Sequence, residues 1–261
     1  MVDFLGKVAV VSGGAQGLGR AFVEVLSSKG VNVLLFDVRS EVLDIASGLG
    51  SYVHGLVADV SKLSDVEQVI STACDQFGGV DILINNAAIW KRTPVSQKWE
   101  DALVDFDTIM NTNLKGVLML SRACVPSFKA RGGGDIVNIS SWDVLPARSF
   151  ETNPIDQDLY LASKWALNGF TDAWADHLQE YKIRVNGLCV GPMETPMRHA
   201  QLSPVEGGPR QESSALAPDD VVRTAIELID SGRTGENVGL WPGEPLKLGS
   251  PPARHLRVTN Q

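Results

Sequence analysis

KVAVVSGGAQGLGRAF, residues 7–22, joins an apolar run to a glycine-rich turn and the start of a helical pattern. The apolar run is typical of a strand that is covered on both faces of a parallel sheet. Gly13, Gly17 and Gly19 let the backbone approach a pyrophosphate closely, and the N-terminus of the following helix presents free N–H groups to that anion. The stretch therefore predicts a nucleotide-binding strand–turn–helix unit. Its spacing departs from the common Gly-x-Gly-x-x-Gly pattern, so an ordinary tight turn remains the alternative.

Asp37 ends the second expected strand, 18 residues past Gly19. In dinucleotide-binding folds, an acid at about this distance binds the ribose hydroxyls of NAD. The carboxylate of Asp37 would repel a 2′-phosphate, and Gln16 stands where a basic residue would help to bind one. We therefore expect NAD rather than NADP as the cofactor, with Arg39 as the residue that argues against it.

Short apolar runs alternate with amphipathic helical patterns, which predicts a parallel sheet built from strand–helix–strand units. Strands are expected at residues 7–12, 32–37, 52–58, 81–85, 135–140, 182–189 and 237–241, and helices at residues 17–29, 40–48, 62–77, 99–130, 158–180 and 218–231. The predicted fold is α/β, a single doubly wound Rossmann domain over residues 1–248 with a seven-stranded parallel sheet and helices on both faces. Residues 142–157 and 195–217 break the alternation and are expected to be substrate-binding loops. Residues 249–261 are expected to be a C-terminal tail.

The composition is that of an ordinary soluble globular protein, with 44% hydrophobic and 21% charged residues among 261. A net charge of −8 argues against binding to nucleic acid or to an anionic membrane surface. No apolar run has the length of a membrane span, and the first strand begins without a secretion signal before it. Cys74, Cys124 and Cys189 lack metal-ligand spacing, so we expect reduced thiols, no metal site and a cytoplasmic location.

Tyr160 and Lys164 lie four residues apart and therefore share one face of an expected helix. The pKa of a free tyrosine is roughly 10, and a nearby positive charge lowers it. A pKa of about 7 would require roughly 4 kcal/mol of differential stabilisation of the phenolate. The two residues are a candidate acid/base pair, although the same spacing occurs in helices whose lysine is merely solvated.

Five motifs follow one another along residues 7 to about 241: Gly13-x-x-x-Gly17-x-Gly19, Asn85-Asn86-Ala87-Ala88, Asn113, Ile136-Val137-Asn138-Ile139-Ser140-Ser141 and Tyr160-x-x-x-Lys164. With these motifs the chain resembles the short-chain dehydrogenase/reductase family. The resemblance implies an NAD-dependent enzyme that interconverts a secondary alcohol and a ketone. It implies that Tyr160 is the general acid/base and that Lys164 binds the nicotinamide ribose and lowers the pKa of Tyr160. It further implies that Ser141 is catalytic and that Asn113 holds a proton-relay water.

The resemblance also implies cofactor contacts from the glycine turn to the loop after the sixth strand, made by Gly13, Gln16, Gly17, Leu18, Gly19, Asp37, Asp59, Val60, Asn86, Ala87, Tyr160, Lys164, Met193 and Thr195. These roles agree with elementary chemistry. Hydride leaves an alcohol carbon only as the hydroxyl proton is removed, and a phenolate can take that proton. The neutral hydroxyl of Ser141 can orient the substrate oxygen and stabilise charge that develops on it.

The chain departs from the family pattern at three places. Ser141 precedes Tyr160 by 19 residues, where about 12 or 13 are common, and the extra residues are expected to line the substrate entrance. The Pro-Gly that usually follows the sixth strand reads Val190-Gly191-Pro192, and Ala88 replaces a glycine. We expect the cofactor contacts of the next loop to survive these changes.

Loops at the carboxyl ends of the strands supply candidates for a mainly apolar substrate pocket: Trp90, Trp142, Leu145, Phe150, Met193, Met197 and Leu202. Polar candidates are Arg148, Glu151, Asp156, Arg198 and His199. Each of these residues also fits ordinary loop packing or a solvated loop face. The expected substrate is a secondary alcohol or ketone of moderate size.

The resemblance implies a homotetramer or a homodimer built partly through the helix of Tyr160, whose apolar Trp165, Leu167, Phe170 and Trp174 can face both core and partner. Two alternative functions stay open. One is a non-redox lyase of the halohydrin dehalogenase type, although such relatives replace the lysine and lose the dinucleotide loop. The other is a catalytically silent NAD-binding protein, because fold does not fix function.

Overall fold

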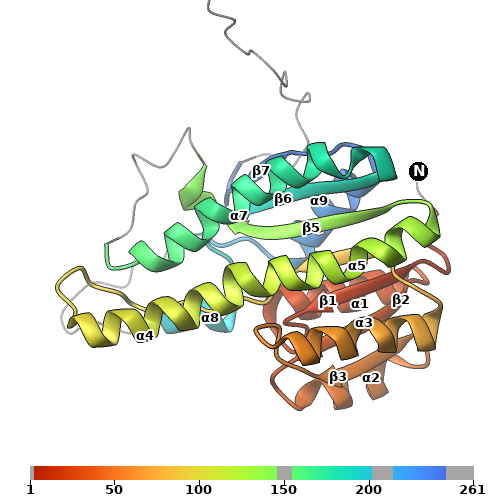
Figure 1. The fold of residues 1–261 in the computed structure, drawn as a ribbon, viewed down its shortest axis with the longest axis horizontal. Helices are drawn as coiled ribbons and strands as arrows, with labels where there is room; N and C mark the ends of the chain where they lie inside the picture. The colour runs from red at the N-terminus through yellow and green to blue at the C-terminus, as the bar shows by residue number, and fades with distance from the viewer. Residues whose placement is uncertain (1–2, 146–154, 202–213, 245–261) are drawn as a thin grey trace, which may run out of the picture.

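The computed structural model describes residues 3–145, 155–201 and 214–244. Parallel strands form one sheet in the order β3-β2-β1-β4-β5-β6-β7 (Figure 1). The strands are β1 (Val8–Ser12), β2 (Asn32–Asp37), β3 (Val53–Val57), β4 (Ile82–Asn85), β5 (Gly134–Ser141), β6 (Ile183–Val190) and β7 (Asn237–Leu240). The prediction of a seven-stranded, doubly wound α/β fold is confirmed, and each strand lies within one residue of its predicted bounds.

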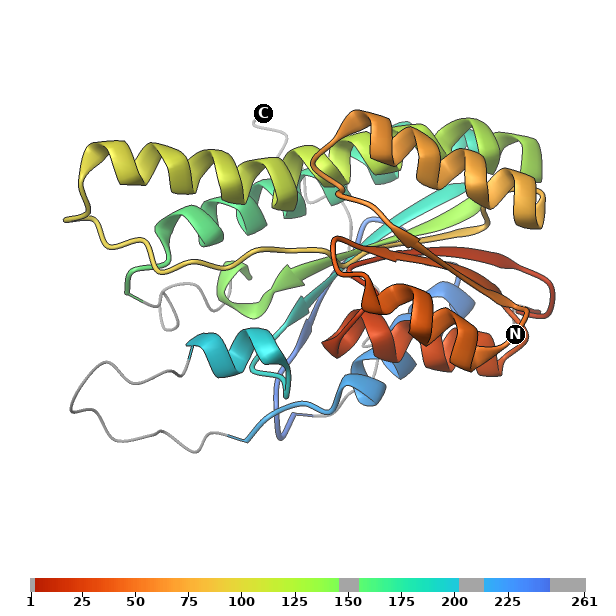
Figure 2. The same ribbon diagram turned by 90° about the horizontal axis from the view of Figure 1, so that it is seen from below.

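Helices cover the sheet in two layers (Figure 2). One layer contains α1 (Gly17–Ser28), α2 (Glu41–Leu49) and α9 (Pro218–Asp230), and the other contains α3 (Leu63–Phe77), α5 (Val117–Arg131) and α7 (Asp158–His177). Successive residues of β1 point to opposite faces of the sheet, so Val11 packs in the core under the first layer and Val10 in the core under the second. Both cores consist mainly of buried aliphatic and aromatic side chains, which explains why the strand sequences are apolar without alternation.

The predicted helix at residues 99–130 is divided by a π-helical turn. It consists of α4 (Trp99–Met110), the π turn η1 (Asn111–Gly116) and α5, and α4 extends past the edge of the sheet (Figure 1). Ile109, Asn113 and Val117 are all buried, four residues apart. Eight residues of a regular helix would turn Val117 by about 80° away from Ile109, because each residue adds about 100°. The wider turn of η1 compensates for this rotation and keeps all three residues on the buried side.

Two further short helices lie where loops were expected, and one predicted helix ends early. The 3₁₀ turn η2 (Trp142–Val144) follows β5 directly, and α8 (Pro196–Gln201) follows the loop after β6. The helix expected at residues 158–180 ends at His177 and continues as the 3₁₀ turn η3 (Gln179–Tyr181).

Buried carboxylates at the amino ends of the strands are paired with arginines. Asp81 accepts hydrogen bonds from Arg131 at 2.7 Å and 3.2 Å and from Lys7 at 3.4 Å. Asp135 accepts two bonds of 2.6 Å from Arg184. Burial by itself would raise the pKa of Asp81, but its donors, Arg131 first, hold that pKa below the usual value. These pairs fasten neighbouring strands and α5 together at this edge.

None of the helices in the described residues is long and apolar enough to cross a membrane. None of the placed His, Cys, Asp and Glu side chains form a group of three or more that could hold a metal ion.

Candidate active site

A cavity of about 710 Å³ lies at the carboxyl ends of the strands. Its walls come from segments that follow β1, β2, β3, β4, β5 and β6, together with α7 and α8. The strand order reverses between β1 and β4, and ligands of open α/β sheets bind at such a switch point. The cavity therefore lies where the fold predicts a ligand.

The glycine turn forms one end of the cavity and tolerates no side chain at its key positions. Gly13 and Gly17 have φ values of +68° and +54°, which favour glycine. A Cβ atom on Gly19 would lie 2.1 Å from the carbonyl oxygen of Gly13. Gly13, Gly17 and Leu18 line the cavity, whereas Gly19 serves the tight packing of the turn. A phosphate could thus approach the turn and the N-terminus of α1 closely.

Asp37 lies beside this turn at the end of β2. Its carboxylate accepts hydrogen bonds from the backbone N–H of Ala15 at 3.3 Å and of Arg39 at 3.2 Å. The guanidinium of Arg39 donates to Gln16 at 2.6 Å and to Glu41 at 2.6 Å and 3.2 Å. Asp37, Gln16 and Arg39 all line the cavity, so the residues that favour and oppose a 2′-phosphate meet at one place.

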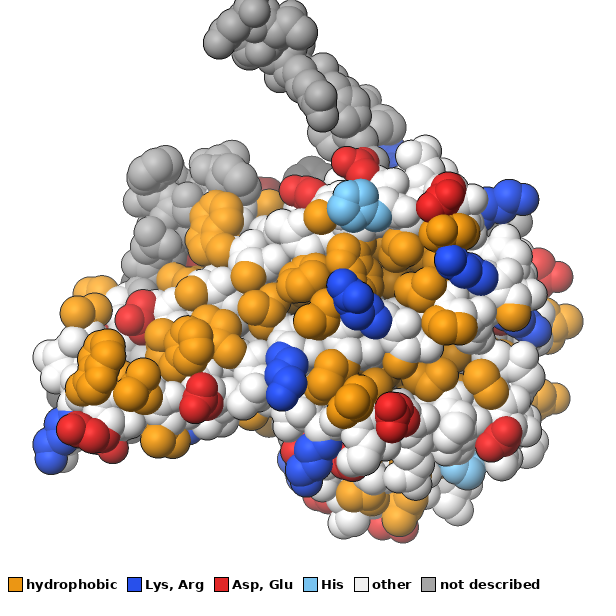
Figure 3. All heavy atoms as spheres, viewed as in Figure 1, with side chains coloured by type: hydrophobic (Ala, Val, Ile, Leu, Met, Phe, Trp, Pro, Cys, Tyr) orange, Lys and Arg blue, Asp and Glu red, His pale blue; other side chains and the backbone are white. Residues whose placement is uncertain are grey.

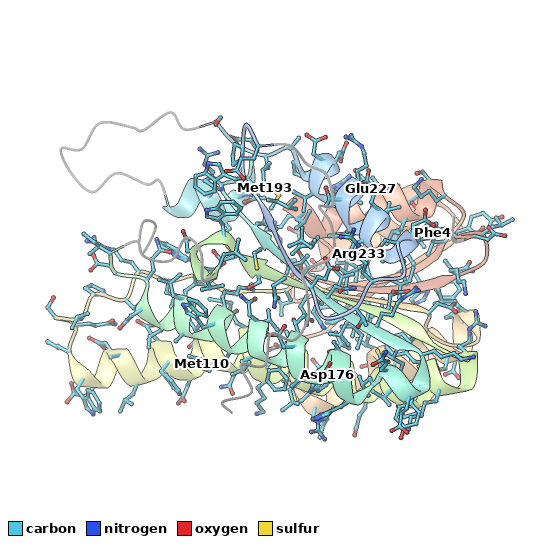
Figure 4. The ribbon with its side chains drawn as sticks, turned by 90° about the horizontal axis from the view of Figure 1, so that it is seen from above. Phe4, Met110, Asp176, Met193, Glu227 and Arg233 are labelled. Atoms are coloured by element: carbon cyan, nitrogen blue, oxygen red, sulfur yellow. The ribbon has the colours of Figure 1, made fainter. Side chains whose placement is uncertain are left out.

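The remaining expected cofactor contacts also line the cavity: Asp59, Val60, Asn86, Ala87, Met193 and Thr195. Asn86 holds the turn after β4 against the glycine turn, because its side-chain amide donates to the carbonyls of Ser12 and Gly13 at 3.0 Å and 3.1 Å. Met193 lies on the loop between β6 and α8, on the other side of the sheet from Met110 of α4 (Figure 4).

Ser141, Tyr160 and Lys164 line the same cavity at the end of β5 and on the first turns of α7. Only 9% of the Tyr160 surface and 3% of the Lys164 surface are exposed. The Lys164 ammonium lies 5.6 Å from the centre of the Tyr160 ring and donates to the carbonyl of Ile139 at 2.8 Å. A buried phenol, an ammonium and a hydroxyl thus share one wall, an arrangement that can exchange a proton with a bound alcohol or ketone.

The pKa of Tyr160 differs from the expectation of a lowered value. Burial raises it well above the usual range, the charge of Asp143 raises it further, and the Ser141 hydroxyl lowers it. Burial likewise lowers the pKa of Lys164 to about 8, which weakens the very charge that was expected to stabilise the phenolate. Desolvation outweighs the pairing of the two residues here, because both charged forms lose their hydration in the same buried place.

Asn113 is fully buried and does not line the cavity. Its side-chain oxygen accepts from the N–H of Ile89 at 2.7 Å, and its NH₂ group donates to the carbonyl of Ile89 at 2.9 Å and to Ser163 at 3.1 Å. Ser163 in turn donates to the carbonyl of Tyr160 at 2.6 Å. The side chain of Asn113 therefore ties the segment after β4 to the helix of Tyr160.

The expected substrate residues separate into four groups. Met193 and Met197 line the cavity, and Trp142 stacks on Trp241, a cavity residue, with ring centres 5.1 Å apart. Trp90 packs against the cluster around Tyr160, and Leu145 lies against β7, so these two support the walls. Phe150, Leu202, Arg148, Glu151 and the side chain of His199 lie outside the described residues. Arg198, which also lines the cavity, pairs with Glu194 at 3.0 Å, and Asp156 pairs with Arg92 at 2.7 Å.

The segment after β4 clamps the chain just before α7, which compensates for the long connection from Ser141 to Tyr160. Arg92 donates twice to Asp156, and Thr93 donates to the Asp158 carboxylate at 2.5 Å and to the Asp156 carbonyl at 2.7 Å. Asp156 adopts a φ of +64°, a strained value for a residue other than glycine. These contacts fix the start of α7 from the segment after β4.

Asp143, Gln157 and Trp241 also line the cavity, and sequence reasoning did not name them individually, although the first two lie in residues 142–157, the expected substrate loop. Asp143 had a usable signal, since it follows Ser141 by two residues at the end of a central strand. Gln157 stands just before α7, where a pocket residue was to be expected. Nothing in the local sequence distinguishes Trp241, because its place depends on the pairing of β7 with β6.

Comparison with known proteins gives one consistent result. The family model "short chain dehydrogenase" matches residues 7–205. The chain is 31% identical to 3-oxoacyl-acyl-carrier-protein reductase FabG of Thermotoga maritima over 88% of this chain and 85% of that one. It is 32% identical to a 3-alpha-(or 20-beta)-hydroxysteroid dehydrogenase of Mycobacterium tuberculosis over 90% and 79% of the two chains. A 3-ketoacyl-(acyl-carrier-protein) reductase of Brucella melitensis, solved with NADH, superposes with a TM-score of 0.78 at 27% identity, covering 91% and 97% of the two chains.

Proposed function

The chain belongs to the short-chain dehydrogenase family, and we propose that it is an NAD(H)-dependent enzyme that interconverts a secondary alcohol and a ketone. One observation carries the proposal. A single cavity has a glycine turn and Asp37 at one end and Ser141, Tyr160 and Lys164 at the other. A dinucleotide and a small carbonyl compound need these two kinds of surface within one continuous space.

The residues present fit NAD better than NADP. The glycine turn leaves room for a pyrophosphate, and the carboxylate of Asp37 lies where it can accept hydrogen bonds from the hydroxyls of a ribose diol. A 2′-phosphate would meet the carboxylate of Asp37 and would have to draw Arg39 away from Gln16 and Glu41. When bound, the nicotinamide supplies the hydride acceptor or donor.

In the proposed reaction, Tyr160 exchanges a proton with the substrate oxygen. The buried phenol is protonated, so it donates a proton to a ketone as the oxygen gains charge, and it must first lose that proton to serve oxidation. The Ser141 hydroxyl orients the same oxygen, and Lys164 keeps a positive charge near the phenol. We propose that Asn113 acts by holding the helix of Tyr160 in place.

The proposed substrate is a ketone or alcohol of moderate size. Met193, Met197 and Trp241 provide an apolar wall, and Asp143 and Gln157 add polar groups to the same cavity. The names of the relatives cover acyl chains, steroids and D-beta-hydroxybutyrate, so the family fits several carbon skeletons. The buried thiols of Cys124 and Cys189 suit a reducing compartment, and we propose the cytoplasm.

We propose a homotetramer or homodimer whose contact includes α4. Trp99, Leu103 and Phe106 are exposed by 73%, 49% and 44% and lie along one stripe of that helix, on a face where hydrophobic side chains gather (Figure 3). Trp165 of α7 is 40% exposed, whereas Leu167 is fully buried in the monomer.

Leu103→Glu should lower the molar mass measured by analytical ultracentrifugation, and a wild-type monomer at micromolar concentration would contradict the proposal.

A panel of secondary alcohols and ketones, tested in both directions with each cofactor, examines the proposed function. NADH should give at least about tenfold higher kcat/KM than NADPH, because like charges at Asp37 disfavour the 2′-phosphate.

Tyr160→Phe should lower turnover by about 100-fold to 10,000-fold while NADH affinity, followed by fluorescence titration, stays near that of the wild type. Preference for NADPH would refute the cofactor assignment, and substantial turnover by Tyr160→Phe would refute the proposed acid/base.

A further inference from the structure

Asp143 places a carboxylate directly beside the proposed catalytic serine. It lies in η2, two residues after Ser141, and lines the cavity together with Ser141 and Tyr160. Its carboxylate lies 3.2 Å from the Ser141 hydroxyl oxygen, and its backbone N–H donates to that oxygen at 3.3 Å. The tight 3₁₀ turn therefore brings both the side chain and the backbone of Asp143 onto one hydroxyl group.

The Ser141 hydroxyl has a single hydrogen to donate. An ionised carboxylate can only accept, so the contact with Asp143 directs this hydrogen toward the carboxylate. The Tyr160 phenolate and the substrate oxygen need the same hydrogen. Asp143 thus competes with the two oxygens that react, and it does so at hydrogen-bond distance.

The charge of Asp143 also acts on Tyr160 directly. After burial it is the next cause that raises the pKa of the phenol, and the Ser141 hydrogen bond opposes it. Among the described residues, Lys164 on α7 lies beside the phenol, the buried Cys189 on β6 interacts with Lys164, and Arg198, which is paired with Glu194, lines the same cavity. Geometry and charge therefore act in the same direction, toward a protonated tyrosine.

We propose that Asp143 is a positioning residue, which holds the Ser141 hydroxyl and thereby sets the pH range over which Tyr160 exchanges its proton with the substrate. This role rests on the proposed function. It favours ketone reduction near neutral pH, because reduction uses the protonated phenol and oxidation uses the phenolate.

Asp143→Asn tests the role, since it keeps the size of the side chain and removes the charge. The rate of reduction falls and the rate of oxidation rises as pH passes through the pKa of Tyr160. Both midpoints in the pH profiles of kcat should move to lower pH by roughly one unit, because removing a nearby like charge lowers the pKa of an acid. Below the midpoints, oxidation by the variant should exceed that of the wild type by up to about tenfold.

Two further variants separate this role from a structural one. Asp143→Glu retains the charge and should restore midpoints close to those of the wild type. Asp172→Asn removes an equal charge from an exposed position farther along α7, where Asp172 accepts from Asn237, and should leave both midpoints in place. Thermal melting of each variant reports whether it is folded, and the KM for the ketone should change far less than the pH profile.

The outcomes distinguish the two proposals. A wild-type protein that turns over no alcohol or ketone with either cofactor overturns the proposed function and this inference together. An active Asp143→Asn variant with unmoved midpoints overturns the inference alone. If Asp143→Asn does not fold, Asp143→Glu provides the test. Its pH midpoints should equal those of the Asp172→Asn control, and midpoints that differ from the control would contradict the inference.

Discussion

The two ends of the sheet treat buried charge in opposite ways. At the amino ends, Asp81 and Asp135 meet arginines at 2.6–2.7 Å, and their charges are neutralised within the fold. At the carboxyl ends, Lys164 is more deeply buried than those arginines, yet its hydrogen bond goes to the neutral carbonyl of Ile139. One edge is arranged to hold the strands together, whereas the other keeps an ionisable pair in a costly environment, where its protonation responds to what enters the cavity.

Lys164→Met removes the buried ammonium at the carboxyl ends of the strands, and we expect it to have the largest effect on activity. Turnover should fall by about 100-fold or more, because the positive charge beside the proposed acid/base is lost. The free energy of unfolding should rise by about 1 kcal/mol, since an apolar side chain replaces a desolvated ammonium. Activity and stability should therefore move in opposite directions.

The stability gain of Lys164→Met should depend on pH. Burial lowers the pKa of Lys164 to about 8 in the folded protein, below its unfolded value of roughly 10.4. Between these values the unfolded chain binds the extra proton, so wild-type stability rises with pH there. The gain should be largest below about pH 8 and shrink toward pH 10. Denaturant unfolding at several pH values measures it, and a loss of stability at pH 7 would contradict this picture.

Asp81→Asn removes a buried carboxylate at the amino ends of the strands. It should lower stability and leave activity unchanged. It leaves Arg131 and Lys7 without their carboxylate, and we expect a loss of about 2 kcal/mol, below the 3–5 kcal/mol of fully buried pairs because Lys7 and Arg131 are partly exposed. The folded pKa of Asp81 is lowered, so its contribution is complete above about pH 4 and disappears as pH falls below that. Activity per folded molecule should remain that of the wild type.

Arg223→Gln provides the matched control and the smallest expected effect. Arg223 and Asp220 form an ion pair of 3.0 Å on the exposed face of α9 and do not line the cavity. Its loss should change the free energy of unfolding by less than about 0.5 kcal/mol in denaturant titrations. A loss of stability as large as that of Asp81→Asn would show that the buried ion pairs at the amino ends contribute no more stability than an exposed pair.

The strands and most helices could be predicted because their signals are local. Apolar runs gave each strand within one residue, and the glycine turn and Asp37 predicted where one end of the cavity would lie. The division of residues 99–131 could not be predicted, because one wide turn changes the helical period too little to be seen in a single sequence. The 3₁₀ turn after Ser141 is equally short, and its Asp143 resembles an ordinary loop carboxylate until the turn directs it back onto the serine.

The pKa of Tyr160 is the most instructive difference. The four-residue spacing predicts that Tyr160 and Lys164 lie on one face of a helix, and both residues do line the same cavity. The sign of the shift depends on how much water each group loses, and spacing carries no information about that. Burial of both residues is a tertiary property that arises from the packing of α7 against β5 and η1.

The π turn at Asn111–Gly116 makes the chain sensitive to its length at this point. If the same residues formed an ordinary helix, α4 would rotate relative to α5 by about 80°, and the anchor of Asn113 on Ile89 and the outward stripe of Trp99 would no longer face their present directions. Deleting one residue from the turn would instead let an ordinary helix keep these faces aligned to within about 20°, because Ile109 and Val117 would then lie seven residues apart. Deletion and insertion scanning, rather than substitution, is the way to reveal how much of this molecule depends on a single turn.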